Sequence, residues 1–364
     1  MKRAGNLFGR ICSFENLLAA ARRARRGKRL RPDVLAFDHD LEANLLQLQC
    51  ELWEGRYRPG PYHSFGIRDP KPRLISAAPY RDRVVHHAAC QVIEPVVERG
   101  FIADSYANRV GKGTHKALDR CTQFSRRYAY VLKCDIAKYF PSMDHEILLG
   151  LIARRIKCPG TLDLLGVIIA HSNPQEQAVW YFPGDDLFTP FTRRRGMPIG
   201  NLTSQLFGNV YLDGFDHFVK EELGCRAYLR FADDFLVFSD NGRELRELLP
   251  RLQEYLDGLR LRLHPRKCHV VPTRCGVVFL GWQVYPDHRR LNRATGVRFQ
   301  RRLRDLSRDY RDGRVTSDRV RASIMSYLGH LKHGDTRGLR RKLLGEVVFT
   351  RRLGAIDGRV RSDD

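Results

Sequence analysis

Segments with helical spacing of apolar residues alternate along the chain with short, strand-like apolar runs. Apolar residues three or four positions apart predict helices in four segments, 14–26, 38–54, 81–99 and 202–223. Asp38 or Asp40 could cap the second of these helices. The segment 172–196, rich in Pro, Gly and aromatic residues, predicts an irregular, loop-rich interval.

Aromatic and β-branched runs predict the strands. The stretch SFGIRDPKPRLISAAP (64–79) is strand-like with turn residues at its middle, and YAYVLKCDIAKYF (128–140) reads as a buried strand running into a turn or helix. The stretch RAYLRFADDFLVFSD (226–240) predicts two strands joined by a tight hairpin, and GVVFLGWQVYP (276–286) predicts another strand pair. Helices and strands together indicate an α+β protein.

The C-terminal segment 289–364 differs in its charge. It holds 21 Lys and Arg against 9 Asp and Glu, a net charge of +12. Phe299, Leu303, Leu306 and Tyr310 fall on one face of a predicted helix with arginines on the other, and Thr295 is a plausible N-cap. Such a helix is often simply solvated, but this local excess of charge favours contact with phosphate groups.

The whole chain is basic. Its 364 residues contain 64 Lys and Arg against 41 Asp and Glu, a formal charge of +23. A polyanionic partner is the first explanation, because arginine binds phosphate bidentately and releases counterions. An arginine-favouring genome would explain the choice of Arg over Lys, but not the imbalance of charge.

The cysteines and the hydropathy favour a cytoplasmic protein. The nine cysteines form no CxxC pair and no evident disulfide grid, which favours a reducing compartment. The N-terminus has no long apolar signal region, and no apolar run approaches the ~20 residues of a membrane span. We therefore expect a soluble, cytoplasmic protein.

Two adjacent carboxylates, Asp233 and Asp234, interrupt the apolar run of the predicted hairpin. An exposed turn explains them simply, since Asp favours turns. The alternative is a divalent-metal site, which needs a further carboxylate from elsewhere in the chain. Asp135 ends an apolar strand and supplies one. Carboxylates that hold two cations about 4 Å apart are a known device for phosphoryl transfer to a hydroxyl group.

At these positions the sequence resembles reverse transcriptases, and the resemblance runs through nearly the whole chain. Cys134 to Phe140 resembles their motif A and Phe231 to Asp234 their motif C. The other matching motifs also lie in the right order along the chain: upstream of motif A are 70–89 and 106–118 (fingers), between motifs A and C is 194–219 (motif B), and after motif C are 263–271 (motif D) and 279–282 (primer grip).

The resemblance implies the right-hand polymerase fold, with fingers, an antiparallel palm sheet with helices, and a helical thumb. Four parts are expected: an N-terminal helical extension, 1–55; fingers, 56–133, with a first palm helix near 81–99; a palm, 134–288, with a fingers insertion at about 150–196; and a basic helical thumb, 289–364.

It also implies a catalytic site. Asp135, Asp233 and Asp234 would be the catalytic, metal-binding carboxylates, with the backbone carbonyl of Ile136 as a further ligand. The implied cofactor is Mg²⁺, as two ions, with Mn²⁺ as a possible substitute. Lys267 could donate a proton to the leaving pyrophosphate, although an exposed structural lysine is an equally ordinary interpretation.

Several residues would bind the incoming nucleotide. Phe140 matches the aromatic residue that excludes a 2′-hydroxyl, although core packing would also explain it. Lys71 and Arg73 match cations that hold the triphosphate, and a basic surface strand is the alternative. Ile199, Gly200 and Gln205, in motif B, would line the nucleotide. Template and primer would be contacted by Arg109, Lys112, Ser204, Gly281, Trp282, Arg298, Arg301 and Arg302.

The motif GMPIGNLTSQ (196–205) has Ile199 where many retroviral enzymes carry Gln. In this it is similar to the corresponding motif of reverse transcriptases from diversity-generating retroelements. That family copies a template RNA into cDNA, misincorporates opposite adenines and works with a small basic accessory protein. The implied partners are therefore template RNA, primer–template, dNTPs and such a subunit. An antiphage-defence or other bacterial reverse transcriptase is the main alternative, and a non-catalytic RNA-binding protein on a polymerase scaffold is another.

Overall fold

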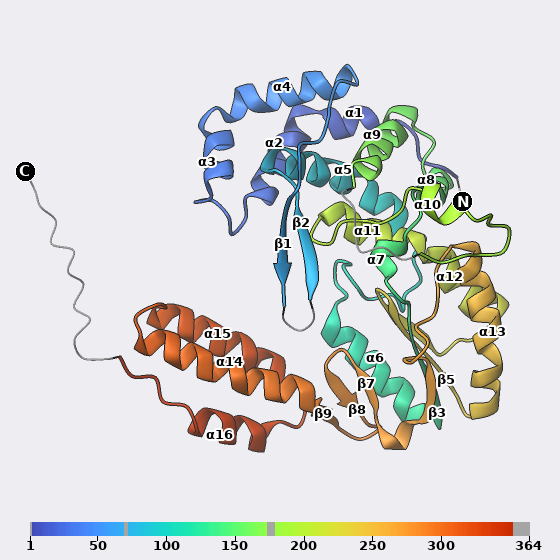
Figure 1. Ribbon diagram of the computed structural model, residues 1–364, viewed down its shortest axis with the longest axis vertical. Helices are drawn as coiled ribbons and strands as arrows, with labels where there is room; N and C mark the ends of the chain where they lie inside the picture. Colours follow the sequence, from blue (N-terminus) through green and yellow to red (C-terminus); the bar gives the residue numbers. More distant parts are fainter. Residues whose placement is uncertain (1, 69–71, 173–178, 352–364) are drawn as a thin grey trace, which may run out of the picture. The chain divides into compact units, whose positions relative to one another are not determined.

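The computed structural model describes residues 2–68, 72–172 and 179–351, which form a mixture of helices and strands (Figure 1). The expected mixture of helices and sheets is therefore confirmed. The chain divides into two compact units. The first unit comprises 1–113, 133–237 and 244–269, and the second comprises 114–132, 238–243 and 270–364. Among the described residues, no helix is both long and apolar enough to cross a membrane.

The core of the first unit forms around one long helix, α5 (Tyr80–Glu98), whose apolar positions are buried along most of its length. The N-terminal helices α1 (Phe8–Cys12), α2 (Phe14–Ala24), α3 (Pro32–His39) and α4 (Leu41–Trp53) precede it. Side-chain to backbone hydrogen bonds fix α2 against α5: Asn16 donates to the carbonyl of Ala88 at 3.1 Å, and Tyr80 donates to that of Ala21 at 2.9 Å.

The predicted cap of the second helix is only partly right. Asp40 occupies the N-cap position of α4, but its side chain accepts no capping hydrogen bond. Asp38, in α3, instead accepts a hydrogen bond from Arg25, the C-cap residue of α2, at 2.8 Å, so its carboxylate forms an ion pair between the two helices.

A two-stranded hairpin follows the N-terminal helices. Strand β1 (His63–Ile67) pairs antiparallel with β2 (Arg73–Ala77), and Ile67 lies opposite Arg73. The hairpin extends away from the helices (Figure 1) and exposes most of its side chains. Lys71, which comes between the two strands in the sequence, lies outside the described residues.

The central sheet has four strands in the order β4-β5-β3-β6. Their bounds are β3 Tyr130–Asp135, β4 Tyr228–Phe231, β5 Asp234–Ser239 and β6 His269–Pro272. Most side chains of β3, β4 and β5 are buried, and apart from Arg230 in β4 and Asp135 at the end of β3 the buried ones are apolar or aromatic, as the sequence pattern predicts.

Most of the remaining helices belong to the first unit. They are α7 Tyr139–Ser142, α8 His145–Ala153, α9 Pro159–Ala170, α10 Thr189–Thr192, α11 Leu202–Tyr211, α12 Asp213–His217, the π-helical turn Phe218–Glu222, and α13 Gly242–Gly258. The predicted helix 202–223 is thus present in three consecutive pieces.

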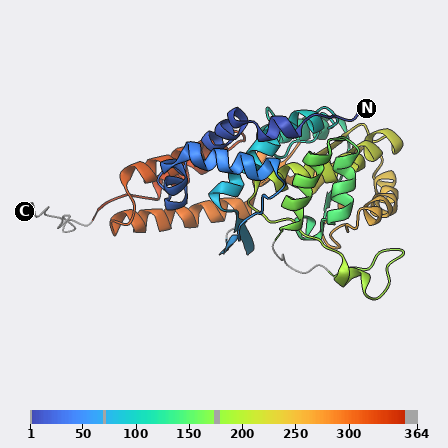
Figure 2. The same cartoon turned by 90° about the horizontal axis from the view of Figure 1, so that it is seen from above.

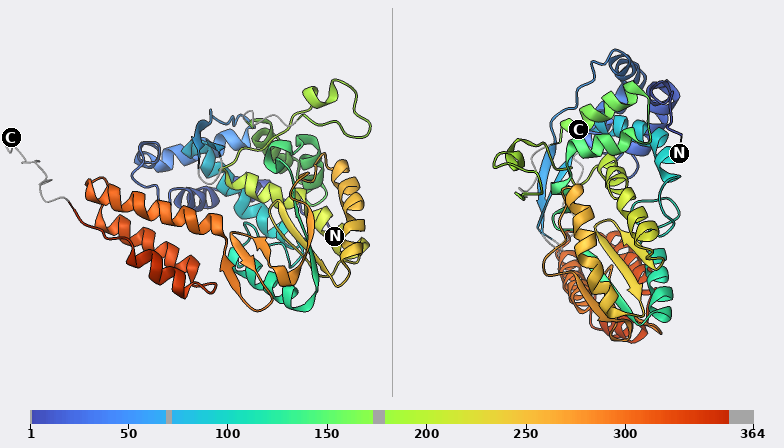
Figure 3. Two further views of the ribbon diagram at one scale, coloured as in Figure 1. Left: turned by 60° about the horizontal axis from the view of Figure 1, so that its bottom comes forward. Right: turned by 90° about the vertical axis from the view of Figure 1, so that its right-hand side faces the viewer.

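The second unit contains α6 (Thr114–Arg127), a 3₁₀ turn, a three-stranded sheet and three helices. The remaining elements are the turn Thr273–Cys275, β7 Val277–Phe279, β8 Trp282–Val284, β9 Arg289–Leu291, α14 Arg293–Arg311, α15 Ser317–Leu331 and α16 Arg337–Gly345. Helices α14 and α15 lie side by side (Figures 1 and 3).

The apolar face predicted for α14 is present, because Phe299 and Leu303 are buried against α15 and α16 residues. The predicted cap at Thr295 is wrong. The helix begins at Arg293, and Asn292 caps it by accepting a hydrogen bond from the backbone of Ala294 at 3.0 Å. Asn and Thr both cap helices, so residue type alone did not fix the start.

Candidate active site

The paired carboxylates lie on a tight hairpin between β4 and β5. Phe231 pairs with Asp234, so Ala232 and Asp233 form the turn. Ala232 has a φ of +56°, a left-handed conformation that costs energy for a residue with a side chain. This turn holds Asp233 and Asp234 where β4 ends and β5 begins, next to strand positions that are mostly buried.

Asp135 lies beside this turn. It ends β3, the neighbour of β5 in the sheet, and the next backbone amide, that of Ile136, donates to the carbonyl of Asp233 at 3.1 Å. On its other side, the carbonyl of Asp135 accepts from the amide of His264 at 2.7 Å. The structure therefore brings Asp135 next to Asp233 and Asp234, which lie far from it in the sequence.

The proximity of these carboxylates affects the pKa values of Asp233 and Asp234. Burial, and to a smaller extent the charge of Asp135, raises the pKa of Asp233 above its ordinary value. Burial likewise raises the pKa of Asp234 to about 6, with Lys133 opposing the shift and the other two aspartates adding to it. Lys267 donates from Nζ to Oδ1 of Asp135 at 2.7 Å. The site thus concentrates negative charge and compensates part of it with lysine.

The donor chemistry fits Mg²⁺, which prefers hard oxygen ligands and often takes only one or two carboxylates alongside water and substrate phosphates. Asp135, Asp233 and the carbonyl of Ile136 would supply such ligands. Across the described residues, however, no three His, Cys, Asp or Glu side chains converge as a ready ligand set. The arrangement suits an ion whose coordination shell is completed by water and substrate, rather than one that is enclosed by protein ligands alone.

A hollow of about 590 Å³ lies between the β1–β2 hairpin and the segments that follow β3 and precede α11. Its lining consists of Gly66, Ile67, Arg68, Pro72, Arg73, Leu74, Pro141 and Ile199. Burial is the largest influence on the pKa of Asp233 and raises it, and the charge of Arg73 opposes this rise only as the smallest of the contributions. The hollow is therefore positive on its hairpin side, and the charge of one of its lining residues, Arg73, acts on Asp233.

The motif B residues are fixed to the hairpin by the backbone. The amide of Ser76 donates to the carbonyl of Ile199 at 3.0 Å. Gly200 has a φ of +123°, and a Cβ there would lie 3.1 Å from Ile75, so glycine is required for this approach. Gln205 is exposed on α11, whereas Ser204 is buried, with its hydroxyl unpaired among the described residues.

Phe140 follows the carboxylate strand by one turn and is partly exposed. Its ring lies over Gly208 of α11, where an added Cβ would be 3.5 Å away. Its carbonyl accepts from the amide of Met197 at 2.8 Å, which joins the motif A and motif B segments. The hydrogen bond fixes the backbone of Phe140, and the absence of a side chain at Gly208 lets its ring approach α11 closely.

Two predicted nucleic-acid contacts in this unit are engaged within the protein. The guanidinium of Arg109, only 5% exposed, pairs with Glu98 and donates to the carbonyls of Ile102 and Ser105. Lys112 donates to the carbonyl of Ala103 at 2.6 Å. Both side chains therefore stabilise the loop after α5.

In the second unit, Gly281 lies in the turn between β7 and β8 with a φ of +84°. Trp282 beside it is fully buried and packs on Gly334, so a contact with nucleic acid at this turn would come from the backbone. Arg301 and Arg302 are exposed on α14, and Arg298 is partly exposed. Arg302 also lies over the ring of Tyr327.

One group near the site was not assigned a role from the sequence. Arg230 is fully buried in β4, pairs with Asp216, and donates to the carbonyl of Ala232 at 3.1 Å. Asp216 also accepts from Tyr228 at 2.6 Å. An arginine within an apolar strand was the available signal, since a buried charge requires a partner.

Clustered acidic side chains on a sheet hairpin, next to a cationic hollow, are compatible with a template-directed polymerase. The sequence profile of the reverse transcriptase (RNA-dependent DNA polymerase) family matches residues 67–284, more than half of the chain. The chain therefore belongs to the reverse transcriptase family.

Curated relatives are distant. Protein YkfC of Escherichia coli is 25% identical over 283 residues, which cover 66% of this chain and 71% of that protein. The group II intron-encoded protein LtrA of Lactococcus lactis is 24% identical over 183 residues, covering 50% and 29%. Nuclear intron maturase 2 of Arabidopsis thaliana is 24% identical over 138 residues, covering 34% and 19%. The chain thus spans less than a third of either intron protein.

Proposed function

We propose that this protein is an RNA-directed DNA polymerase that copies an RNA template into cDNA. The observation that carries the proposal is the convergence of Asp135 with the Asp233–Asp234 turn, beside a hollow large enough for a nucleotide. Membership of the family supports the reaction class, and nucleic acid and nucleotides are the substrates that the family implies.

Each group has a proposed task. Bound Mg²⁺ would supply activation of the primer 3′-hydroxyl and stabilisation of the pyrophosphate. Asp135, Asp233 and the carbonyl of Ile136 would hold the metal, and Asp234 would add negative charge. Arg73 would bind the triphosphate as it enters the hollow. Lys267 would have to leave Asp135 before it could protonate the pyrophosphate.

The finer proposal is a diversity-generating reverse transcriptase that misincorporates at template adenines. Its support is the resemblance in motif B, together with the position of Ile199 in the nucleotide hollow, where it can pack but not donate a hydrogen bond. A small basic accessory protein would then be a partner. A role in antiphage defence would use the same chemistry on a different template.

A second candidate is RNA binding without polymerisation, because one relative is named an intron maturase. Primer extension separates the two. A DNA primer on a defined RNA should be extended with dNTPs and Mg²⁺ or Mn²⁺ by the wild type, but not by Asp233→Ala or Asp135→Asn, while all three bind the RNA. The exposed Asp163 offers a matched control, since Asp163→Asn should extend normally. Binding without extension by the wild type would favour the second candidate.

The template can be found directly. Purification of the full chain with its co-bound RNA, followed by sequencing of that RNA and of the cDNA made from it, would identify the template and the errors. Errors concentrated at adenines would support the diversity-generating subtype, and errors spread evenly over the four bases would contradict it.

A further inference from the structure

The segment 179–195, between α9 and α11, exposes an unusual number of aromatic side chains. Phe188 is 71% exposed and Phe191 is 66% exposed, on and beside the single turn of α10. Leu187 and Tyr181 are exposed nearby. Exposed apolar groups that lie together, rather than singly, mark a binding surface.

Hydrogen bonds within this segment hold it in shape. Asp186 accepts from the backbone amides of Phe188 at 2.9 Å and Thr189 at 2.7 Å. Asp185 accepts from both terminal nitrogens of Arg260, at 2.8 and 2.5 Å. The aromatic side chains are therefore presented by an ordered turn, which lowers the entropic cost of binding.

Both ends of the segment are tied to the candidate active site. Arg262 donates to the carbonyl of Tyr181 at 2.6 Å, and its own carbonyl accepts from Ala137, two residues after Asp135. At the other end, the amide of Met197 donates to the carbonyl of Phe140. The α10 segment and the β1–β2 hairpin extend from the same side of the first unit (Figures 2 and 3).

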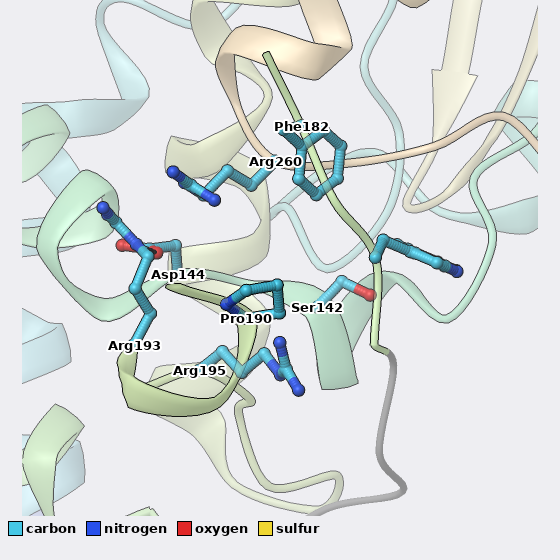
Figure 4. A pocket seen from close by; sticks show the side chains of 8 residues that line it. Ser142, Asp144, Phe182, Pro190, Arg193, Arg195 and Arg260 are labelled. Carbon is cyan, nitrogen blue, oxygen red and sulfur yellow. Dashed lines mark hydrogen bonds and ion pairs between the residues drawn. The ribbon is translucent and has the colours of Figure 1, made fainter. Parts of the chain in front are cut away.

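Arginines follow the aromatic residues. Arg193 lies beside Asp144 and pairs with it at 2.6 Å, whereas Arg195 lies on the other side of Pro190 (Figure 4). Neither Arg194 nor Arg195 makes a side-chain ion pair or hydrogen bond with any residue that the structure describes. Burial lowers the pKa of Arg195 below its ordinary value, and Asp144 opposes this only partly. Such a cation favours an incoming anion.

The hollow beside Arg195 has room for about 20 Å³, on the order of one water molecule. A base could not enter it. A strand would instead lie across its mouth, with a phosphate near Arg195 and bases against the exposed rings.

We propose that residues 179–195 form a stacking surface for the unpaired template strand ahead of the primer, with bases on Phe188 and Phe191 and phosphates on Arg194 and Arg195. This inference rests on the proposed polymerase function. Aromatic rings beside cations are the recurring means of binding single strands without sequence preference. A protein partner would be served as well by aliphatic side chains and would not need the two arginines.

The test measures the affinity of the full chain for two labelled primer–templates, one blunt and one with a six-nucleotide unpaired 5′ RNA template. The wild type should bind the second more tightly, by roughly fivefold or more for each stacked base. Phe188→Ala/Phe191→Ala and Phe188→Leu/Phe191→Leu should both lose this gain and bind the blunt duplex normally. Leu30→Ala, which removes another highly exposed apolar side chain in the same unit, should behave as the wild type.

Arg195→Gln should reduce the salt dependence of binding to the overhang by about one ion. The inference is overturned if the wild type gains nothing from the overhang, or if the leucine pair keeps the full gain, because leucine cannot stack on a base and the gain would then have another source. Extension by a single nucleotide is measured on the same samples. If extension fails in the wild type, the proposed function fails, and the overhang measurements still decide the stacking surface separately.

Discussion

Arg230 and Asp216 form a bidentate ion pair with no solvent exposure of either side chain. Nε and Nη2 of Arg230 lie 2.7 and 2.6 Å from the two carboxylate oxygens of Asp216. The remaining nitrogen, Nη1, donates to the carbonyl of Ala232, in the strained turn that carries Asp233. The pair therefore connects a helix of the first unit to the position of a candidate catalytic carboxylate.

Breaking this pair should destabilise the protein strongly. Arg230→Met leaves the carboxylate of Asp216 buried without its cation, and we expect a loss of about 3–5 kcal/mol in the free energy of unfolding. The double variant Arg230→Met/Asp216→Leu removes both charges and should recover most of this loss. Urea denaturation of the wild type, both single variants and the double variant measures the coupling. If the losses of the single variants simply add in the double variant, the pair has no special role.

His86 should make stability depend on pH. Burial, with smaller contributions from His87, Arg83 and His171, lowers its pKa to about 3 in the folded protein. The unfolded chain has a His pKa of about 6.5, so it binds the proton more readily. The stabilisation is therefore fully present above about pH 6.5 and is lost as the pH falls towards 3, by up to about 1.4 kcal/mol per pH unit.

His86→Leu should remove this contribution. Thermal or urea unfolding of both proteins from pH 7 to pH 4 should show a smaller loss of stability for the variant, and the difference between them should grow as the pH falls. The carboxylates titrate in both proteins, so their contribution cancels when one curve of unfolding free energy against pH is subtracted from the other. Parallel curves would mean that His86 is not protonated on unfolding.

Local patterns predicted much of this fold because they depend on near neighbours in the sequence. The helices around Leu45 and Val85, the hairpin at Asp233 and the apolar face of α14 all follow from spacing and residue type. The cap at Thr295 was wrong because two capping residues, Asn292 and Thr295, lie within four positions, and only the backbone decides between them.

The site was partly predictable for a different reason. Asp135 could be linked to Asp233 through the motif resemblance, since spacing does not define contacts between distant strands. The partner of Arg230 could not be chosen, because any buried acid could have satisfied it. The burial of Arg109 and Trp282 was equally invisible, since it depends on Glu98 and Gly334, which tertiary packing brings to them.

Phe140 should decide between deoxynucleotides and ribonucleotides. Its ring is fixed over Gly208, and its carbonyl is bonded to Met197, so it cannot easily withdraw from an added 2′-hydroxyl. Phe140→Ala should reduce the preference for dNTPs over rNTPs by about tenfold or more, because the steric overlap disappears. Single-nucleotide extension with dCTP and CTP measures the ratio. Phe140→Tyr keeps the ring and should keep the preference, and an unchanged ratio in the alanine variant would assign Phe140 to core packing.

Ile199 should determine how accurately bases are paired. Its side chain lines the nucleotide hollow together with Arg73 and Pro141, and its backbone is fixed by Ser76, so a substitution changes the chemistry at a constant position. Isoleucine can only pack, whereas glutamine can hydrogen-bond near the nucleotide. Discrimination should therefore be weakest where the correct base pair is weakest, and wild-type errors should be most frequent opposite adenine.

Ile199→Gln should lower these errors several-fold, while Ile199→Leu, which preserves the apolar contact, should leave them unchanged. Sequencing cDNA copied from one RNA of balanced composition measures all three proteins under the same conditions. A wild-type error rate opposite adenine no higher than that opposite C, G and U would contradict the prediction. An equal fall in both variants would instead point to the shape of the hollow, since leucine introduces no hydrogen bond.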